Sequence, residues 1–457
     1  MDFIEFLFLS GINLGMMVFI IRKWGIASAE GFCMAYLGAA ALTDSLELIY
    51  HYFLSPDMLH LGYAEFAFRI YPTALHIVGL VVLFAGLAAV NFGPSPIARP
   101  LDKTGITHLK RLGVAIAIVG ALLTSGAIYL VRALSAPSFY AAINAFRSQA
   151  LPFGGFWYRG ADVIVIGLGL TLPSYRNNLR RFFCTLAFMM LVSFFLRTNK
   201  GGLEEPVLWG ALIVYLYDRE FFRTLCRPRN VALACAIAFF GMGAKLWFLP
   251  FAYHRTENAP VTLTKIVDLA TSTAATRWGD DSLYRGYCQF VNSLPDNRSL
   301  FAGNKVGIYT LTSWVPRFLL PNKPDHPFRG LGFMVYSDFH TLPMETPAPT
   351  LAGSAMADDG FRSLISYLFL AGIFLSTLRI CTTMPEQSLY RHVGYVLFVL
   401  FGGLSAEEGI LGLIYTLLLA YGVIAAAFFI ESIWKLSRAN SRPTAAVHSI
   451  PMRSGSH

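Results

Sequence analysis

Long apolar runs dominate this sequence and restrict its fold more than any other feature. Eleven runs can be read at 3–21, 31–53, 70–92, 112–134, 161–174, 182–196, 206–217, 230–252, 363–380, 392–406 and 409–433. Most are long enough to cross the roughly 30 Å of hydrocarbon in a bilayer. With 55% hydrophobic and only 14% charged residues, a soluble chain of 457 residues would expose large apolar patches. The sequence therefore predicts an all-α, polytopic membrane protein.

Basic residues near the ends of these runs predict the orientation of the chain. Arg22 and Lys23 follow the first run and no basic residue precedes it, which favours a membrane anchor over a signal peptide. If the runs alternate, the segments on the side of Arg22 hold 19 of the 36 Lys and Arg residues. The positive-inside rule then places the N-terminus outside and the C-terminus in the cytoplasm. The net charge of +9 reflects this topology, and no nucleic-acid partner is predicted.

The spacing of the runs divides the chain into four parts. These are an N-terminal membrane bundle of about eight spans (1–252), an extracytoplasmic loop or lid (253–362), a C-terminal bundle of about three spans (363–433) and a disordered cytoplasmic tail (434–457). Long loops usually carry function, so the lid is the first place to look for a site.

Three segments of the lid have the spacing of short amphipathic helices: 261–273, 282–294 and 305–315. In the second segment one face is apolar and comprises Leu283, Tyr287, Phe290, Val291 and Leu294. We expect each helix to lie at the outer boundary between membrane and water.

A proline-rich stretch follows these helices at 314–324, with the sequence Trp-Val-Pro-Arg-Phe-Leu-Leu-Pro-Asn-Lys-Pro. Proline fixes φ and lacks a backbone donor, so this spacing excludes a regular helix or strand. We call residues 314–324 the proline track. It predicts a bent, rigid segment that directs Arg317 and Lys323 toward one place.

The lid carries ten Lys and Arg residues on the side where the positive-inside rule gives no reason for them. Guanidinium and ammonium groups suit phosphate oxygens, and aromatic rings beside them can stack on sugars. The candidate substrate-binding residues are Arg317, Lys323, Arg285, Arg147, Arg159, Lys200, Trp314 and Tyr284. For any one of these cations, the alternative is an ion pair with an acidic residue of the same loop.

Motifs for cofactor and metal binding are missing from the sequence. It contains no P-loop, no dinucleotide-binding glycine pattern, no Gly-x-Ser-x-Gly and no His-Glu-x-x-His. The six cysteines form no closely spaced motif. No cofactor and no metal are therefore predicted.

Three short motifs give the chain a family resemblance. They are Pro-Arg-x-x-x-Pro-x-Lys-Pro at 316–324, Ala-Pro-Thr-Leu-Ala-Gly-Ser at 348–354 leading through Gly360 into the next run, and Asn-Lys-Gly-Gly at 199–202. Together with the number of runs and the late outer loop, they resemble the Wzy-type repeat-unit polymerases of bacterial O-antigen and exopolysaccharide synthesis. Family members often carry a Glu before the last outer-loop glycine, where this chain has Ser354, Asp358 and Asp359.

The resemblance implies a GT-C-like membrane glycosyltransferase of the bacterial inner membrane. Such an enzyme polymerises oligosaccharide repeat units at the outer face, moving the growing glycan from polyprenyl diphosphate onto the sugar of an incoming lipid-linked unit. Its partners are membrane lipid, a chain-length regulator and a flippase. The lid cations would stabilise the departing diphosphate, and Asp358, Asp359 or Asp280 would accept the proton of the acceptor hydroxyl.

Two other functions fit much of the same pattern. An O-antigen ligase would use the same donor with a different acceptor, and the proline track favours the polymerase. A lipid-linked oligosaccharide transporter or flippase would be expected to show internal repeats and several charges along the middle of its spans. The charges of this chain gather instead in the lid.

Overall fold

The computed structural model describes residues 2–25, 62–90, 101–133, 154–197, 201–253, 262–268, 283–312, 315, 319–328, 350–383 and 389–440, with Gly31, Ala35, Gly38 and Leu42. Its helices are α1 (Asp2–Trp24), α3 (Gly62–Val90), α4 (Lys103–Ala133), α6 (Gly154–Thr171), α7 (Leu179–Arg197), α8 (Gly201–Tyr217), α9 (Arg219–Leu225), α10 (Pro228–Tyr253), α12 (Leu283–Asn297), α13 (Lys305–Thr312), α14 (Thr350–Met356), α15 (Phe361–Thr383) and α16 (Leu389–Asn440). Short 3-10 helices cover Leu172–Tyr175 and Arg298–Phe301. No strand occurs in the described ranges, which confirms the all-α prediction there.

Four helices among the described residues are long and apolar enough to cross a membrane. The stretches are Ile4–Trp24, Ala67–Val90, Lys103–Ser125 and Leu417–Ser437. Shorter apolar helices cover Gly160–Tyr175, Pro206–Tyr217, Pro228–Gly241 and Phe361–Thr377. Large apolar side chains such as Phe8, Leu122 and Phe429 lie exposed on the long helices, where lipid would cover them. The chain is a helical membrane protein.

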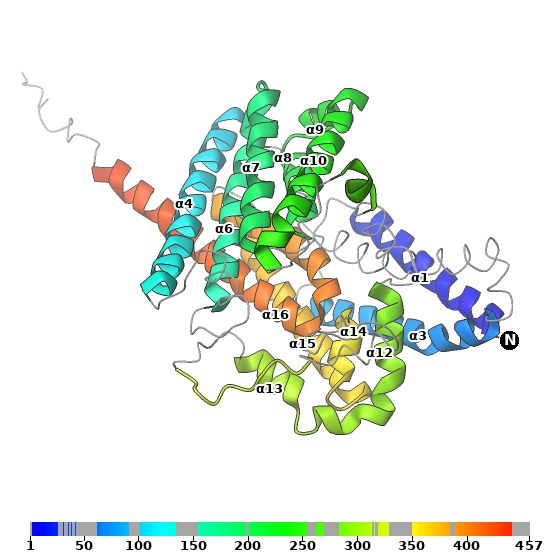
Figure 1. The fold of residues 1–457 in the computed structure, drawn as a ribbon. Helices are drawn as coiled ribbons and strands as arrows, with labels where there is room; N and C mark the ends of the chain where they lie inside the picture. The colour runs from blue at the N-terminus through cyan, green and yellow to red at the C-terminus, as the bar shows by residue number, and fades with distance from the viewer. Residues whose placement is uncertain are drawn as a thin grey trace, which may run out of the picture.

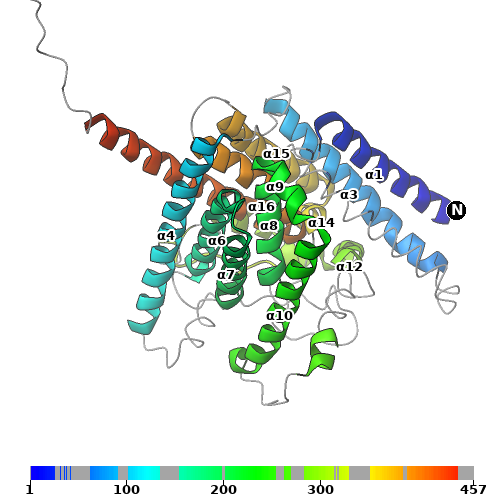
Figure 2. The same ribbon diagram turned by 90° about the horizontal axis from the view of Figure 1, so that it is seen from above.

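Glycines allow two pairs of helices to pack at close range. On α4 and α6, a Cβ at Gly113 would lie 2.5 Å from the Gly167 carbonyl oxygen, and one at Gly120 would lie 2.9 Å from the Gly160 oxygen. On α3 and α15, Gly86 faces Gly372 in the same way. Small residues at such positions let helix backbones approach each other in a membrane, where van der Waals contact replaces the hydrophobic effect. Figures 1 and 2 both show α4 beside α6.

The helix α16 is a hairpin that reverses at Gly409, the residue with φ 77° and ψ −173°. Its two halves run antiparallel, because the N–H of Tyr390 donates to Glu431 Oε2 at 3.3 Å and the Tyr390 ring contacts Phe428. The sequence predicts separate runs at 392–406 and 409–433, and the reversal falls at the first residue of the second run.

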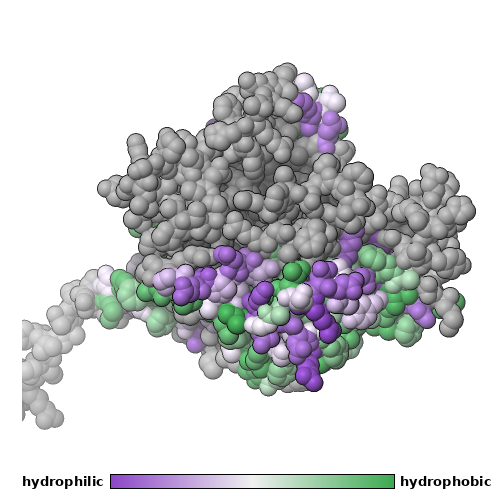
Figure 3. Space-filling model, turned by 60° about the horizontal axis from the view of Figure 1, so that its bottom comes forward, coloured by the Kyte–Doolittle hydropathy of each residue, from purple (hydrophilic) through white to green (hydrophobic). Residues whose placement is uncertain are grey.

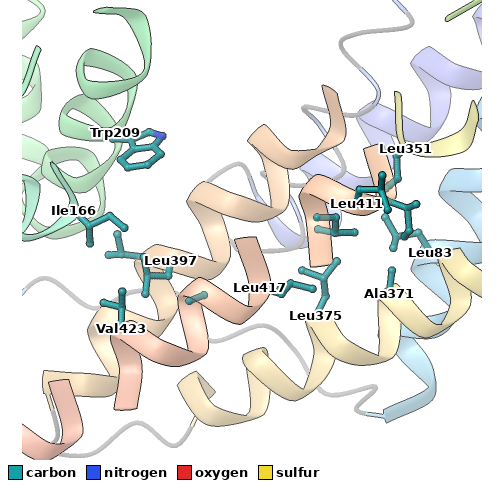
Figure 4. Close-up of a cluster of buried hydrophobic side chains, with 14 of the residues drawn as sticks. Leu83, Ile166, Trp209, Leu351, Ala371, Leu375, Leu397, Leu411, Leu417 and Val423 are labelled. Carbon is teal, nitrogen blue, oxygen red and sulfur yellow. The ribbon is translucent and has the colours of Figure 1, made fainter. Parts of the chain in front are cut away.

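The hairpin lies at the centre of the buried core. Leu397 and Val423 of α16 meet Ile166 of α6 on one side, while Leu411 meets Leu83 and Leu351 on the other (Figure 4). The core is therefore continuous from α6 and α8 through α16 to α3, α14 and α15.

The two ends of this helical assembly differ in character. One end, at the top of Figure 1, carries α9, where Arg176 pairs with Glu220 and with Asp218 at 3.3 Å. The hydrogen bond to Glu220 and the charge of Asp218 raise the pKa of Arg176 above its ordinary value. Asp218 also caps α9 by accepting the Phe221 N–H. The other end carries α12, α13, α14 and Gly409, and we call it the lid end.

Candidate functional site

Three interrupted helices meet at the lid end. Helix α3 contains Pro72, α14 is only seven residues long, and α16 reverses at Gly409. Irregular backbone in a membrane protein is tolerated only where protein or a polar cavity satisfies it. Figure 3 views this end, where hydrophilic and hydrophobic surfaces adjoin one another. The interruptions mark the lid end as the candidate functional site.

The interruption of α3 is satisfied by side chains of α12. Pro72 has no N–H, so the carbonyl of Phe68, four residues earlier, loses its helical partner. The side-chain amide of Asn292 donates to that carbonyl at 2.8 Å. The hydroxyl of Tyr287 donates to the carbonyl of Pro72 itself at 2.9 Å. Helix α12 is thus fixed to the one place on α3 where the backbone needs donors.

This contact corrects one expectation for α12. The predicted helix and its apolar face are confirmed, but the prediction that this face lies on the membrane surface is wrong. Tyr287, Phe290 and Val291 are fully buried inside the protein. Gly353 of α14 makes room for them, since a Cβ there would lie 3.1 Å from the Tyr287 ring. Amphipathic spacing identified the face but not its partner.

Polar side chains line the part of α3 beside this contact. Arg69, Thr73 and His76 follow one another at helical spacing and are 3%, 2% and 7% exposed. The ring of His76 lies edge-on to that of Tyr287, with centroids 6.3 Å apart. Buried ionisable groups within a membrane span are costly and usually functional. We call these three residues the α3 polar face.

Helix α14 connects the lid to the reversal of α16. All its residues from Leu351 to Met356 are buried. The hydroxyl of Ser354 donates to the carbonyl of Thr350 at 2.7 Å and accepts the N–H of Ile410 at 2.7 Å. That N–H opens the second half of α16 and has no helical acceptor of its own. Ser354 therefore completes the hairpin, a role that its small hydroxyl side chain suits.

The carboxylate of Asp358 holds α13 against α15. Its two oxygens accept the N–H groups of Val306 and Gly307 at 2.9 and 2.8 Å, in the first turn of α13. The hydroxyl of Tyr367 on α15 donates to it at 2.7 Å. Gly307 permits this arrangement, because a Cβ there would collide with the Tyr367 hydroxyl. Asp358 thus caps a helix from a distant segment.

The next residue, Asp359, differs from Asp358 in its exposure to solvent. Asp359 is exposed, and its backbone N–H donates to Ser363 Oγ at 3.0 Å. The turn closes at Gly360, whose φ of +61° suits glycine, and the guanidinium of Arg298 lies beside it. Of Asp358 and Asp359, the two predicted proton acceptors that the structure describes, Asp359 is the exposed one.

The described part of the proline track folds back on α13. The ammonium group of Lys323 donates to the carbonyl of Val315 at 3.2 Å and lies 5.8 Å from the centre of the Tyr309 ring. Just beyond the track, Phe328 is buried against Phe290 and Phe301, with ring centroids 5.6 Å apart in each pair. The track is therefore anchored at its C-terminal side, and its predicted rigid bend stays a prediction because 314 and 316–318 lie outside the described residues.

The outer side of this assembly is apolar and exposed. Ile308 and Leu311 of α13 are 48% and 74% exposed, and Leu319 of the track is 66% exposed. For α13 the predicted position at the membrane surface stays a prediction, and these side chains are compatible with it. Residues 263–268 are helical within the predicted segment 261–273 and expose Leu263.

Most predicted site residues cannot be placed in this geometry. Arg317, Trp314, Arg147, Lys200 and Asp280 lie outside the described residues. Arg159, Tyr284 and Arg285 belong to α6 and α12 by their backbone, but their side chains lie outside the description. Lys323, Asp358 and Asp359 are described, and all three lie at the lid end. The roles assigned to the whole set stay predictions.

The structure adds buried polar residues that the sequence reading missed. Arg69 lies one residue before the predicted run 70–92 and is therefore absent from the predicted spans. Asp162 of α6 is 2% exposed, although it falls within the predicted run 161–174. A search for ionisable residues inside every apolar run, with boundaries extended by one turn, would have found both.

Comparison of the chain with protein-family models, with curated proteins and with solved structures finds no match in any of the three. Function is therefore argued from the residues of the site itself.

Proposed function

We propose that the protein is a GT-C-like membrane glycosyltransferase that polymerises polyprenyl-diphosphate-linked oligosaccharide repeat units at the outer face of a bacterial inner membrane. One observation carries the proposal. The cation-rich segment is folded onto the membrane helices at the lid end, by α12 on α3 and by Asp358 between α13 and α15. A lipid-linked substrate held in the membrane would present its diphosphate to such a lid.

The chemistry requires a charge stabiliser and a proton acceptor. Departure of polyprenyl diphosphate develops negative charge, which cations held in place stabilise more effectively than mobile ones. Lys323 is held over Tyr309 and bonded to Val315, while Arg317 belongs to the same track. Asp359 suits the role of base better than Asp358, whose oxygens already accept three hydrogen bonds. The acceptor hydroxyl must reach that carboxylate within hydrogen-bonding distance.

The test replaces Arg317 and Lys323 singly by Ala and separates the surface polysaccharide on a gel. We expect both variants to shorten the chains while single repeats still reach the surface. Lys305→Ala is the matched control, since this exposed lid cation bonds only the nearby Leu300 carbonyl among the described contacts. Undiminished long chains in both well-expressed variants would contradict the proposal. Complete loss of repeats from the surface would favour a flippase, and lipid-linked polymer left untransferred would favour a ligase.

A further inference from the structure

We propose that the α3 polar face is a binding site for the phosphate group of a membrane lipid, with Arg69 as its principal cation. The inference deepens the proposed function and rests on it for the identity of the lipid, a polyprenyl diphosphate. The three residues of the site belong to α3 and lie outside both the lid and the proline track.

Arg69 is a buried cation on a helix long and apolar enough to span a membrane. Its side chain is 3% exposed, yet it lies inside the apolar stretch Ala67–Val90. A guanidinium stays charged under all ordinary conditions, so the protein cannot reduce the cost of burial by deprotonating it. Arg69 interacts with other groups of the folded chain, which fix its position. Its five N–H donors allow it to hold such contacts and still bind a phosphate oxygen.

The depth of Arg69 identifies the kind of anion. It directly precedes the apolar run 70–92 of the sequence, so it lies at the end of the apolar part of α3. The phosphate groups of lipids occupy the zone that flanks the hydrocarbon. A phosphate attached to a lipid therefore reaches Arg69 without leaving its own layer, whereas a free anion would have to enter from water.

The neighbours of Arg69 supply further donors. Thr73 and His76 lie one and two turns deeper on the same face of α3, and both are buried. Both residues interact with other groups of the folded chain, and a hydroxyl or an imidazole N–H that exchanges such a partner can donate to a phosphate oxygen. Such a row of donors suits a diphosphate, which offers oxygens at more than one depth.

Helix α12 covers this face in the structure. Its Tyr287 and Asn292 donate to the carbonyls of Pro72 and Phe68, which immediately precede Thr73 and Arg69 in the sequence. Two side-chain hydrogen bonds and the buried side chains of Tyr287, Phe290 and Val291 hold α12 there, so a phosphate that reaches Arg69 has to displace α12 against that packing. Ligand binding is then coupled to the position of the lid.

The alternative to phosphate binding is a purely structural ion pair between Arg69 and Glu65, which precedes it by one helical turn in α3. Oppositely charged residues at this spacing stabilise helices. The two roles predict different behaviour of Glu65→Gln. If Arg69 acts only through a pair with Glu65, Glu65→Gln and Arg69→Gln should lower the lipid affinity equally. If Arg69 binds phosphate, Glu65→Gln should keep or raise the lipid affinity.

The experiment uses the full chain in phosphatidylcholine nanodiscs and titrates undecaprenyl diphosphate, phosphatidylglycerol and inorganic pyrophosphate, with binding followed by native mass spectrometry. We expect undecaprenyl diphosphate to bind the wild type, Arg69→Gln to weaken it at least tenfold and Arg69→Lys to retain part of the affinity. Thr73→Val should weaken it less. Arg176→Gln, a cation variant at the opposite end, should bind as the wild type does. Thermal unfolding without ligand verifies that each variant is folded.

The outcomes separate this inference from the proposed function. Unchanged affinity in folded Arg69→Gln overturns the site, and so does equal loss in Glu65→Gln, or a wild type that binds neither lipid. If Arg69→Gln does not fold, Arg69→Lys and Thr73→Val decide, and unchanged affinity in both overturns it. Arg69-dependent binding of phosphatidylglycerol alone supports a lipid-phosphate site but contradicts the proposed donor. If pyrophosphate binds as tightly as the lipids do, the site is not specific for a lipid phosphate and the proposal is overturned.

Discussion

The carboxylate of Asp358 shows how one side chain can decide between a structural and a catalytic role. Its oxygens accept the N–H groups of Val306 and Gly307, in the first turn of α13, and the Tyr367 hydroxyl. Those N–H groups have no other helical acceptor, so removing the carboxylate leaves them unsatisfied. To act as a base, Asp358 would have to exchange these donors for a substrate hydroxyl. The carboxylate of Asp359, one residue later, accepts no hydrogen bond among those described.

Substitution of these two acids tests the assignment. We expect Asp358→Ala to destabilise the protein by about 1–3 kcal/mol, the usual cost of unsatisfied buried donors, and to lower its unfolding temperature in detergent. Asp359→Asn should leave that temperature unchanged and reduce polysaccharide chain length. The opposite pattern, with Asp358→Asn stable but unable to extend chains, would assign the proton transfer to Asp358.

At the scale of elements, interruptions of helices determine where the lid attaches. Pro72 leaves the Phe68 carbonyl without its helical donor and Asn292 of α12 supplies one, while Gly409 is followed by the Ile410 N–H that Ser354 satisfies. The backbone of Gly409, with φ 77° and ψ −173°, lies in a region that only glycine adopts at low cost. A Cβ on it would also lie 2.7 Å from Ser354 Oγ. Conformation and packing therefore both require glycine at the reversal.

Replacing Gly409 by Ala should therefore weaken the hairpin. We expect a loss of at least about 1–3 kcal/mol from backbone strain alone, seen as a lower unfolding temperature and faster proteolysis between the halves of α16. Gly422→Ala is the matched control, because it lies in the same helix with no atom within 4 Å of a new Cβ. That substitution should be neutral or slightly stabilising. Equal behaviour of the two variants would show that the reversal does not depend on Gly409.

The sequence predicted elements better than contacts. Hydropathy located α12, α13 and both halves of α16, because periodicity and apolar length are local properties. It did not show that α12 packs on α3, since the donors needed at Pro72 become apparent only when the two helices are brought together. The close approach of α4 and α6 rests on glycines seven residues apart, a signal present in the sequence but unspecific by itself.

The candidate site was predicted by region rather than by residue. The lid was identified from its length and its cations, and Lys323, Asp358 and Asp359 do lie at the lid end. The capping role of Asp358 could not be foreseen, because its partners at Val306 and Gly307 are more than 50 residues away. Arg69 was missed because the edge of an apolar run is a poor estimate of where a helix begins.

At the scale of the whole molecule, the proposed function depends on which end faces out. The basic segments predict that Arg176 and α9 are cytoplasmic and that the lid end is outside. The native Cys226 is exposed in the turn after α9, and Lys305 is exposed at the start of α13. Thiol labelling can therefore test separately on which side of the membrane each end lies.

In intact cells, a membrane-impermeant maleimide should label Lys305→Cys and should not label Cys226 until the membrane is permeabilised. In both parents Ser replaces Cys184 and Cys235, which are exposed on α7 and α10, together with Cys33, Cys288 and Cys381; the parent for the outer position also carries Cys226→Ser. Labelling after permeabilisation verifies that each thiol reacts at all. If Cys226 reacts from outside and Lys305→Cys does not, the orientation is reversed. The lid would then face the cytoplasm, and a polymerase acting at the outer face could not use it.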